Sequence, residues 1–162
     1  RNVLHIADAD TAEHGSGSGN QVIWPVSCAV PNRATGAPKL SGGGKLTIVP
    51  GTRFAGIYKK SEVQEEYFCN YEVNPVYQGR LQEAGLRVSA WGEDRAMRAV
   101  ELPGQSFYVA TLFQPQLSST AQAPHPVVMA YLQAASEFAQ TKQLASAGHQ
   151  SNFDVPIKVA RK

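Results

Sequence analysis

Apolar residues recur along the chain with two periods, one typical of helices and one typical of strands. The longest helical pattern follows Pro126 and consists of Val128, Tyr131, Leu132, Ala135, Phe138 and Ala139. Steps of three and four residues place such side chains on one face of a helix, so we predict a helix here that caps the core. The pattern fades beyond about Lys142.

A shorter helix is predicted within NPVYQGRLQEAG, because both of its ends are marked. Asn74 is a good N-cap, Pro75 fits the first helical position, and Gly85 can adopt the left-handed conformation that closes the last turn. The predicted buried stripe consists of Val76, Tyr77, Leu81 and Ala84.

Strand patterns occupy much of the remaining chain. VIWPVSCAV reads as a strand interrupted by Pro25, and KLTIVPGT alternates Leu46 and Ile48 with polar residues before Pro50-Gly51, which indicates a hairpin. The alternation in 86–91 predicts a strand with one exposed face, and 96–102 is the strand that returns after GEDR. The segment FYVATLF is apolar on both faces, so we predict an interior strand covered on each side by helices.

Segments 15–20 and 31–44 are rich in Gly, Pro and Ser and are predicted to be mobile loops. We place one domain at residues 1–142 and a tail at 143–162. The tail either docks through Phe153, Val155 and Ile157 or stays loose.

Composition narrows the class of protein. The chain has 162 residues, 43% of them hydrophobic and 17% charged, which suits one soluble domain with its own core. A formal net charge of +2 gives no electrostatic case for nucleic acid or an acidic membrane surface. No segment has the ~18 consecutive apolar residues of a membrane helix, so we expect a soluble, cytoplasmic protein. No Walker-type loop is present and we predict no cofactor.

Candidate metal ligands and nucleophiles are sparse. Cys28 and Cys69 lack metal-site spacing, and each is most simply a small buried hydrophobe. His5 and His14 flank Asp8, Asp10 and Glu13, which raises a metal hypothesis, but a solvated loop is the better interpretation.

Several separated motifs together resemble one family. These are EEYFCNYEVNPVYQGRLQEAGLRV, VELPGQSFYVATLFQPQLSS and PHPVVMAYLQAA, in this order. They resemble the C-terminal part of the class I glutamine amidotransferase domain of the CTP synthase-like family. RNVLHIADADTAE looks like the segment after that family's nucleophile elbow, and GGGKLTIVPGT stands where the family has GGTMRLG. The resemblance covers residues 1–139 and implies a three-layer, flavodoxin-like α/β fold, a parallel sheet with helices on both faces.

The resemblance also implies catalytic positions. Family members use a histidine in an FHPE motif as the base and the glutamate two residues later to orient it. The matching residues here are Gln114 and Gln116. A carboxamide has no usable proton affinity near neutral pH, so neither can act as general base or acid. His125 matches a family His-Pro pair that opens the last helix, which implies a structural role.

The resemblance also implies that residues with which the family binds its substrate are replaced in this chain. The family has a run rich in Arg and His before YEVN, which here reads Glu66, Tyr67, Phe68, Cys69 and Asn70. Asn70 matches the arginine that helps hold glutamine, and Tyr67 is the other candidate substrate-binding residue. The elbow cysteine would lie before Arg1, so we expect a missing N-terminal half or a partner chain to complete the sheet.

Three hypotheses remain open. The first is a degenerate amidotransferase domain retained as a binding or regulatory scaffold. The second is an active amidotransferase or hydrolase completed by an N-terminal segment that brings the cysteine. The third is a small-molecule module with a pocket beside Gln114 and Tyr67, binding glutamine or another small molecule. A homo-oligomer is compatible with each of them.

Overall fold

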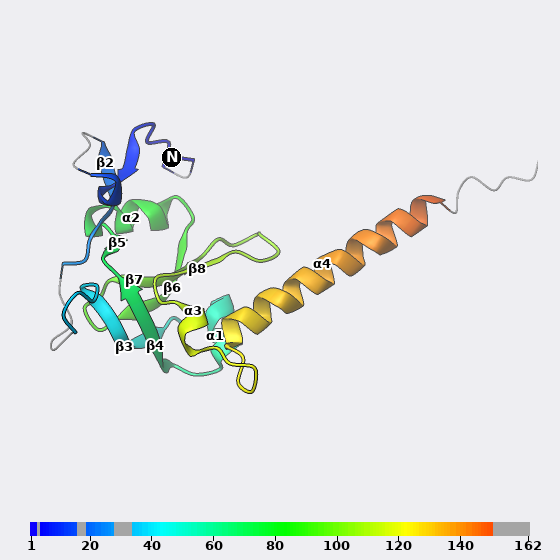
Figure 1. Cartoon of the computed structure of the whole chain (residues 1–162). Coiled ribbons are helices and arrows are strands. Elements are labelled where there is room, and N and C mark those ends of the chain that lie inside the picture. Colours follow the sequence, from blue (N-terminus) through cyan, green and yellow to red (C-terminus); the bar gives the residue numbers. More distant parts are fainter. Residues whose placement is uncertain (3, 16–18, 28–33, 151–162) are drawn as a thin grey trace, which may run out of the picture.

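The computed structural model describes residues 1–2, 4–15, 19–27 and 34–150, with side chains up to residue 144. Its strands form two sheets (Figure 1). The larger sheet has the order β4-β3-β6-β7-β8, and every neighbouring pair in it is antiparallel. Its strands are β3 (Leu40–Ile48), β4 (Glu62–Cys69), β6 (Arg87–Gly92), β7 (Met97–Glu101) and β8 (Val109–Thr111).

The smaller sheet has the order β1-β2-β5, with β1 and β2 parallel and β2 and β5 antiparallel. Its strands are β1 (Ala9–Thr11), β2 (Asn20–Pro25) and β5 (Tyr71–Val73). The helices are the 3₁₀ turn η1 (Ala12–His14), α1 (Arg53–Tyr58), α2 (Pro75–Glu83), α3 (Pro115–Ser118) and α4 (Pro126–Gln150). The β1–β2 pair is the one parallel pair among the described strands, in contrast to the parallel sheet that we expected.

The core lies against the larger sheet, where α1 and the start of α4 cover it. Its buried members are Leu46, Ile48, Phe54, Tyr67, Ala90, Ala99, Phe113 and Val127. Leu46 and Ile48 are buried, so the structure confirms the predicted strand and the side to which its apolar residues face.

The turn predicted at Pro50-Gly51 is wrong. The chain enters α1 there, because the Thr52 side chain accepts a hydrogen bond from the Ala55 amide and caps the helix. The strand that pairs antiparallel with β3 is β4, which follows α1 in the chain. The glycines at 42–44, predicted to lie in a loop, belong to β3. At Gly44 a Cβ would come within 2.8 Å of the Tyr67 ring, so glycine makes room for that ring.

Helix α2 confirms the predicted caps. Asn74 Oδ1 accepts from the Val76 amide, and Gly85 has φ +95°. The predicted stripe is wrong at Val76, which is 77% exposed, and at Ala84, which is also exposed, whereas Tyr77 is buried and Leu81 is half-buried. Helix α2 meets the rest of the chain through one narrow face, and Val76 lies outside it.

Two strand predictions also need correction. Ser89 was expected on an exposed face of β6, but it is fully buried because the ladder to β7 is irregular at this point and both faces are covered. FYVATLF was expected in the middle of a sheet, but only Val109–Thr111 forms a strand, and it lies at the sheet edge.

Helix α4 extends away from the body (Figure 1). Only its start is buried, at Val127, whereas Tyr131, Leu132 and Phe138 of the predicted stripe are exposed. The prediction that this stripe caps the core is therefore wrong for the described chain. The helix also continues past Lys142 to Gln150. None of the described helices has the length and apolarity that a membrane crossing requires. Cys28 and the tail residues Phe153, Val155 and Ile157 lie outside the described residues.

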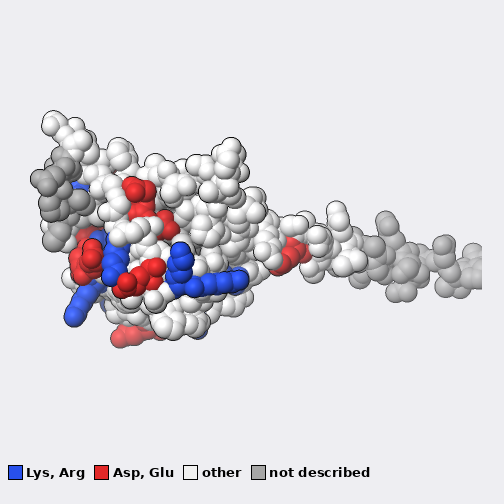
Figure 2. All heavy atoms as spheres, turned by 90° about the horizontal axis from the view of Figure 1, so that it is seen from below, with Lys and Arg blue, Asp and Glu red and all other residues white. Residues whose placement is uncertain are grey.

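Charged side chains of both signs are mixed on the face of the body shown in Figure 2. Lys45 on β3 pairs with Glu62 on β4 at 2.8 Å, and both side chains are exposed. Exposed pairs of this kind contribute little to stability.

Candidate functional site

The position of Gln114 is fixed by its neighbours in the chain. Phe113 is buried in the core, and the Gln114 amide donates to the Glu66 carbonyl at 2.9 Å, which ties the end of β8 to β4. Gln114 is the N-cap of α3, and Pro115 takes the first helical position, where no amide partner is needed. The FQPQ motif therefore sits where the larger sheet curls back towards its other edge strand.

The side chains of Gln114 and Gln116 have different surroundings. Gln114 Nε2 donates to the Phe68 carbonyl at 3.1 Å and lies 3.8 Å from the Cys69 Sγ. Gln116 is exposed. The structure thus does not bring the two amides into one hydrogen-bonded dyad, and the assignment of catalytic positions to them stays a prediction.

Tyr67 and Asn70 contribute to the fold in ways that the sequence did not suggest. Tyr67 is buried, with its ring edge-on to Phe113, whereas an accessible contact to substrate was expected. Asn70 Oδ1 accepts from the Lys39 amide at 2.9 Å, and the Asn70 carbonyl accepts from the Val26 amide at 2.8 Å. The role of these two residues in substrate binding stays a prediction. In the structure Tyr67 packs in the core, and Asn70 fixes the backbone at Lys39 and Val26.

A buried polar cluster behind this site was missed in the sequence. His125 and Glu65 are each about 95% buried, and His125 Nε2 lies 3.0 Å from Glu65 Oε2. His125 Nδ1 accepts from the Val127 amide, so Nε2 carries the proton and donates to the carboxylate. The Tyr58 hydroxyl donates to the same carboxylate. The cluster joins α1, β4 and the start of α4, which agrees with the structural role predicted for His125.

The half-buried Tyr58 and the buried Tyr67 make the stability of the fold fall at alkaline pH. Burial raises the pKa of Tyr58, and the hydrogen bond to Glu65 raises it further. Burial also raises the pKa of Tyr67. In the unfolded chain both phenols ionise at about pH 10, before they would in the folded chain, so this stability is complete below pH ~10 and is lost as pH rises beyond it.

We therefore expect the free energy of unfolding in urea to fall more steeply above pH ~10 in the wild type than in Tyr58→Phe. Each protein is compared with itself at pH ~8, because Tyr58→Phe also removes a hydrogen bond. Tyr108→Phe changes an exposed tyrosine and serves as the control. Equal slopes for the wild type and Tyr58→Phe would contradict the expectation.

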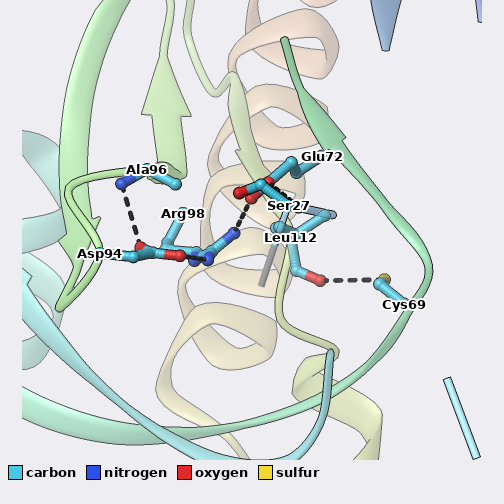
Figure 3. Close-up of polar contacts among 7 residues, drawn as sticks. All are labelled: Ser27, Cys69, Glu72, Asp94, Ala96, Arg98 and Leu112. Carbon is cyan, nitrogen blue, oxygen red and sulfur yellow. Dashed lines mark hydrogen bonds and ion pairs between the residues drawn. The ribbon is translucent and has the colours of Figure 1, made fainter. Parts of the chain in front are cut away.

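A second polar network is centred on Arg98 of β7 (Figure 3). Arg98 and Glu72 are both buried and pair at 2.8 Å, and Arg98 also pairs with Asp94 in the turn between β6 and β7. Glu72 Oε1 accepts from the Ser27 amide at 3.0 Å. The network thereby joins β5 of the smaller sheet to β7 of the larger one. The Cys69 thiol donates to the Leu112 carbonyl at 3.5 Å beside it.

The acidic and histidine residues near the N-terminus do not form a metal site. Asp8 accepts from Asn20, and His14 Nδ1 lies 3.5 Å from Asp10. Among the described residues there is no group of three or more His, Cys, Asp or Glu side chains placed to hold a metal ion. The segment is only in part the solvated loop that we expected, because Asp10 lies in β1 and Glu13 and His14 lie in η1.

Comparisons with known proteins can now be set beside this geometry. CTP synthase of Pyrobaculum calidifontis is 36% identical over 142 residues, which are 85% of this chain and 26% of that protein. CTP synthase of Caldivirga maquilingensis is 35% identical over 136 residues, 83% of this chain and 25% of that protein. The chain therefore spans about a quarter of these relatives. It matches no protein-family model.

Two solved structures share the fold. The glutaminase domain of Trypanosoma brucei CTPS with bound acivicin matches with a TM-score of 0.73 and 30% identity, over 85% of this chain and 54% of that one. A putative GMP synthase protein from Thermoplasma acidophilum matches with a TM-score of 0.53 and 11% identity, over 75% of this chain and 51% of that one, which shows the fold alone.

The fold is that of a flavodoxin-like α/β domain of the class I glutamine amidotransferase type, as the sequence predicted. Within that class the chain belongs to the CTP synthase-like family.

Proposed function

We propose that this chain is part of a CTP synthase-like amidotransferase domain whose glutaminase dyad is degenerate, and that it acts as a binding or regulatory scaffold. The observation that supports this most is the hydrogen bond that the Gln114 side chain donates to the Phe68 carbonyl. An amide nitrogen cannot accept a proton from a nucleophile near neutral pH. Gln116 brings no charge that could orient or stabilise an imidazolium.

No described histidine is placed to replace the missing base. His125 is buried, and its two ring nitrogens are engaged by Glu65 and by the Val127 amide. His5 and His14 are exposed and lie in the N-terminal segment. The Cys69 thiol lies beside Gln114 and donates to the Leu112 carbonyl, and its two polar neighbours are thus an amide and a backbone carbonyl.

The test is ammonia release from glutamine by the intact gene product. We expect none above background in the wild type, since general acid–base help is worth ~10²–10⁴-fold. If the intact protein supplies a nucleophile, Gln114→His/Gln116→Glu is expected to raise the rate. Gln140→His/Gln143→Glu places the same side chains on the exposed face of α4 and should leave it unchanged. Binding without turnover is measured by titration calorimetry with glutamine.

The second candidate is an active amidotransferase completed by a segment that carries the nucleophile. The match to a glutaminase domain that holds acivicin favours it. Ammonia release at ordinary enzymatic rates by the wild type, retained after His5, His14, His125 and His149 are all replaced, would exclude a silent site and leave this candidate.

A further inference from the structure

A groove of about 730 Å³ lies between the C-terminal end of α2 and strand β6. This volume suits a small molecule, because ligand sites measure roughly 300–1,000 Å³. The groove is also bordered by residues that directly follow β3 and β7. Its apolar wall includes Leu86, Val88, Trp91 and Leu102.

The groove is separate from the FQPQ motif. Leu102 and Pro103 come after Glu101, which pairs with Val109 at the start of β8. The FQPQ motif follows the other end of β8, so this part of the groove lies at the opposite end of the sheet. Among the described residues that line the groove, none belongs to FQPQ.

Arg87 is the one charged residue among the described residues that line the groove. Its side chain is 51% exposed, and its Nη1 lies 3.5 Å from Glu101 Oε1, which is long for a bond between arginine and a carboxylate. Glu101 Oε2 already accepts from the Arg53 amide at 2.8 Å. A guanidinium has five N–H donors, so Arg87 keeps donors for an anion. Charge complementarity therefore favours a ligand with one negative group.

A carboxylate suits this groove better than a phosphate. The backbone amides at the end of α2 are already bonded, Gly85 to the Gln82 carbonyl at 2.9 Å and Leu86 to the Leu81 carbonyl at 3.0 Å. They offer no nest of free amides, which many phosphate sites use. One planar guanidinium, by contrast, matches a carboxylate through two parallel hydrogen bonds.

The apolar wall indicates the rest of the ligand. Trp91 and Leu102 are half-buried, so each still presents part of its side chain to the groove. An aromatic ring can pack against the indole of Trp91 in an offset or edge-to-face arrangement. A ligand with a ring and one carboxylate would therefore use both kinds of surface that the groove offers.

We infer that the groove between α2 and β6 binds a small aromatic carboxylate, with Arg87 holding the carboxylate and the apolar wall at Trp91 and Leu102 holding the ring. The inference goes beyond the proposed function, because it names a ligand class and a place away from FQPQ. Its readout is binding of this ligand class and not ammonia release, so each of the two can fail alone.

The test is titration calorimetry of the intact gene product with benzoate, phenylacetate and indole-3-acetate, and with the neutral amide of each. We expect a dissociation constant below about 1 mM for at least one carboxylate. Its amide should bind about ten-fold more weakly, because hydrogen bonds between charged groups are roughly twice as strong as neutral ones.

Arg87→Met should remove this preference, so that the carboxylate binds as weakly as the amide. The comparison separates docking from folding, because a loss of structure would weaken binding of both ligands. Arg95→Met is the matched control, since it removes an exposed arginine from the turn between β6 and β7, and it should keep the preference of the wild type.

Leu102→Trp narrows the groove and should weaken binding of the carboxylate and the amide alike. Gln64→Trp places the same ring on an exposed position of β4 and should bind both ligands like the wild type. The thermal midpoint of each variant shows that it is folded. The inference would be overturned by binding of none of the three carboxylates, by equal affinity of the wild type for acid and amide, or by a preference that survives Arg87→Met.

Discussion

Replacement of Arg98 by Met is expected to lower the free energy of unfolding by about 3–5 kcal/mol. The change leaves the buried Glu72 carboxylate without its cation, and Asp94 loses its partner as well. Glu72 is only 2% exposed, so water cannot take the place of the guanidinium without opening the contact between the two sheets. Urea unfolding followed by tryptophan fluorescence at pH ~7 measures the loss.

The double variant Glu72→Met/Arg98→Met is the matched control. Removing both charges avoids the unpaired carboxylate, so the double variant should be more stable than Arg98→Met although it has one more substitution. Ser27, which donates to Glu72, is exposed and can donate to water instead. A cost below about 1 kcal/mol for Arg98→Met, or a double variant less stable than it, would contradict the importance assigned to this pair.

The second large effect is expected at Phe113, where Ala should cost about 3–5 kcal/mol. The ring is 1% exposed and contacts three other rings. Its centroid lies 6.0 Å from Phe54, 6.3 Å from Tyr67 and 6.0 Å from His125. Truncation would leave a void among side chains from α1, β4 and the start of α4. The measurement is the free energy of unfolding in urea.

Phe68→Ala is the matched control for Phe113→Ala. The same side chain is removed, but Phe68 is 57% exposed on β4, so the change should stay within about 0.5 kcal/mol. Similar costs for the two variants would show that the ring cluster is not the centre of the core.

The sequence predicted best the features that depend on residues close together in the chain. The Asn74 cap, Pro75 and Gly85 define α2 locally, and the structure confirms all three. Thr52 carries a similar signal for α1, but a six-residue helix has too few turns to show a period, and Pro50-Gly51 suggested a hairpin instead.

Contacts between distant residues could not be predicted in this way. Glu72 and Arg98 are 26 residues apart, and Glu65 and His125 are 60 apart, so no local pattern indicates that either pair would be buried together. The apolar character of FYVATLF was interpreted as the mark of a central strand. One face of this segment meets the core through Phe113 and the other lines an uncovered cavity, so a strand apolar on both faces can lie at an edge.

The resemblance assigned catalytic positions to two residues of the FQPQ motif, which stays a prediction, and it did not indicate the surroundings of these residues. Tyr67 was considered for substrate contact from its place before YEVN, although its position on β4 turns it into the core. Facing direction depends on strand register, which Gly44 opposite the Tyr67 ring helps to set.

Phe113 and Gln114 are adjacent in the chain yet under very different constraints. The first is held on every side by aromatic neighbours, whereas the second touches a backbone carbonyl and a sulfur atom through the end of its side chain. Substitutions at 114 and 116 therefore cost the scaffold little. The side chains at these two positions can therefore change while the surrounding architecture persists.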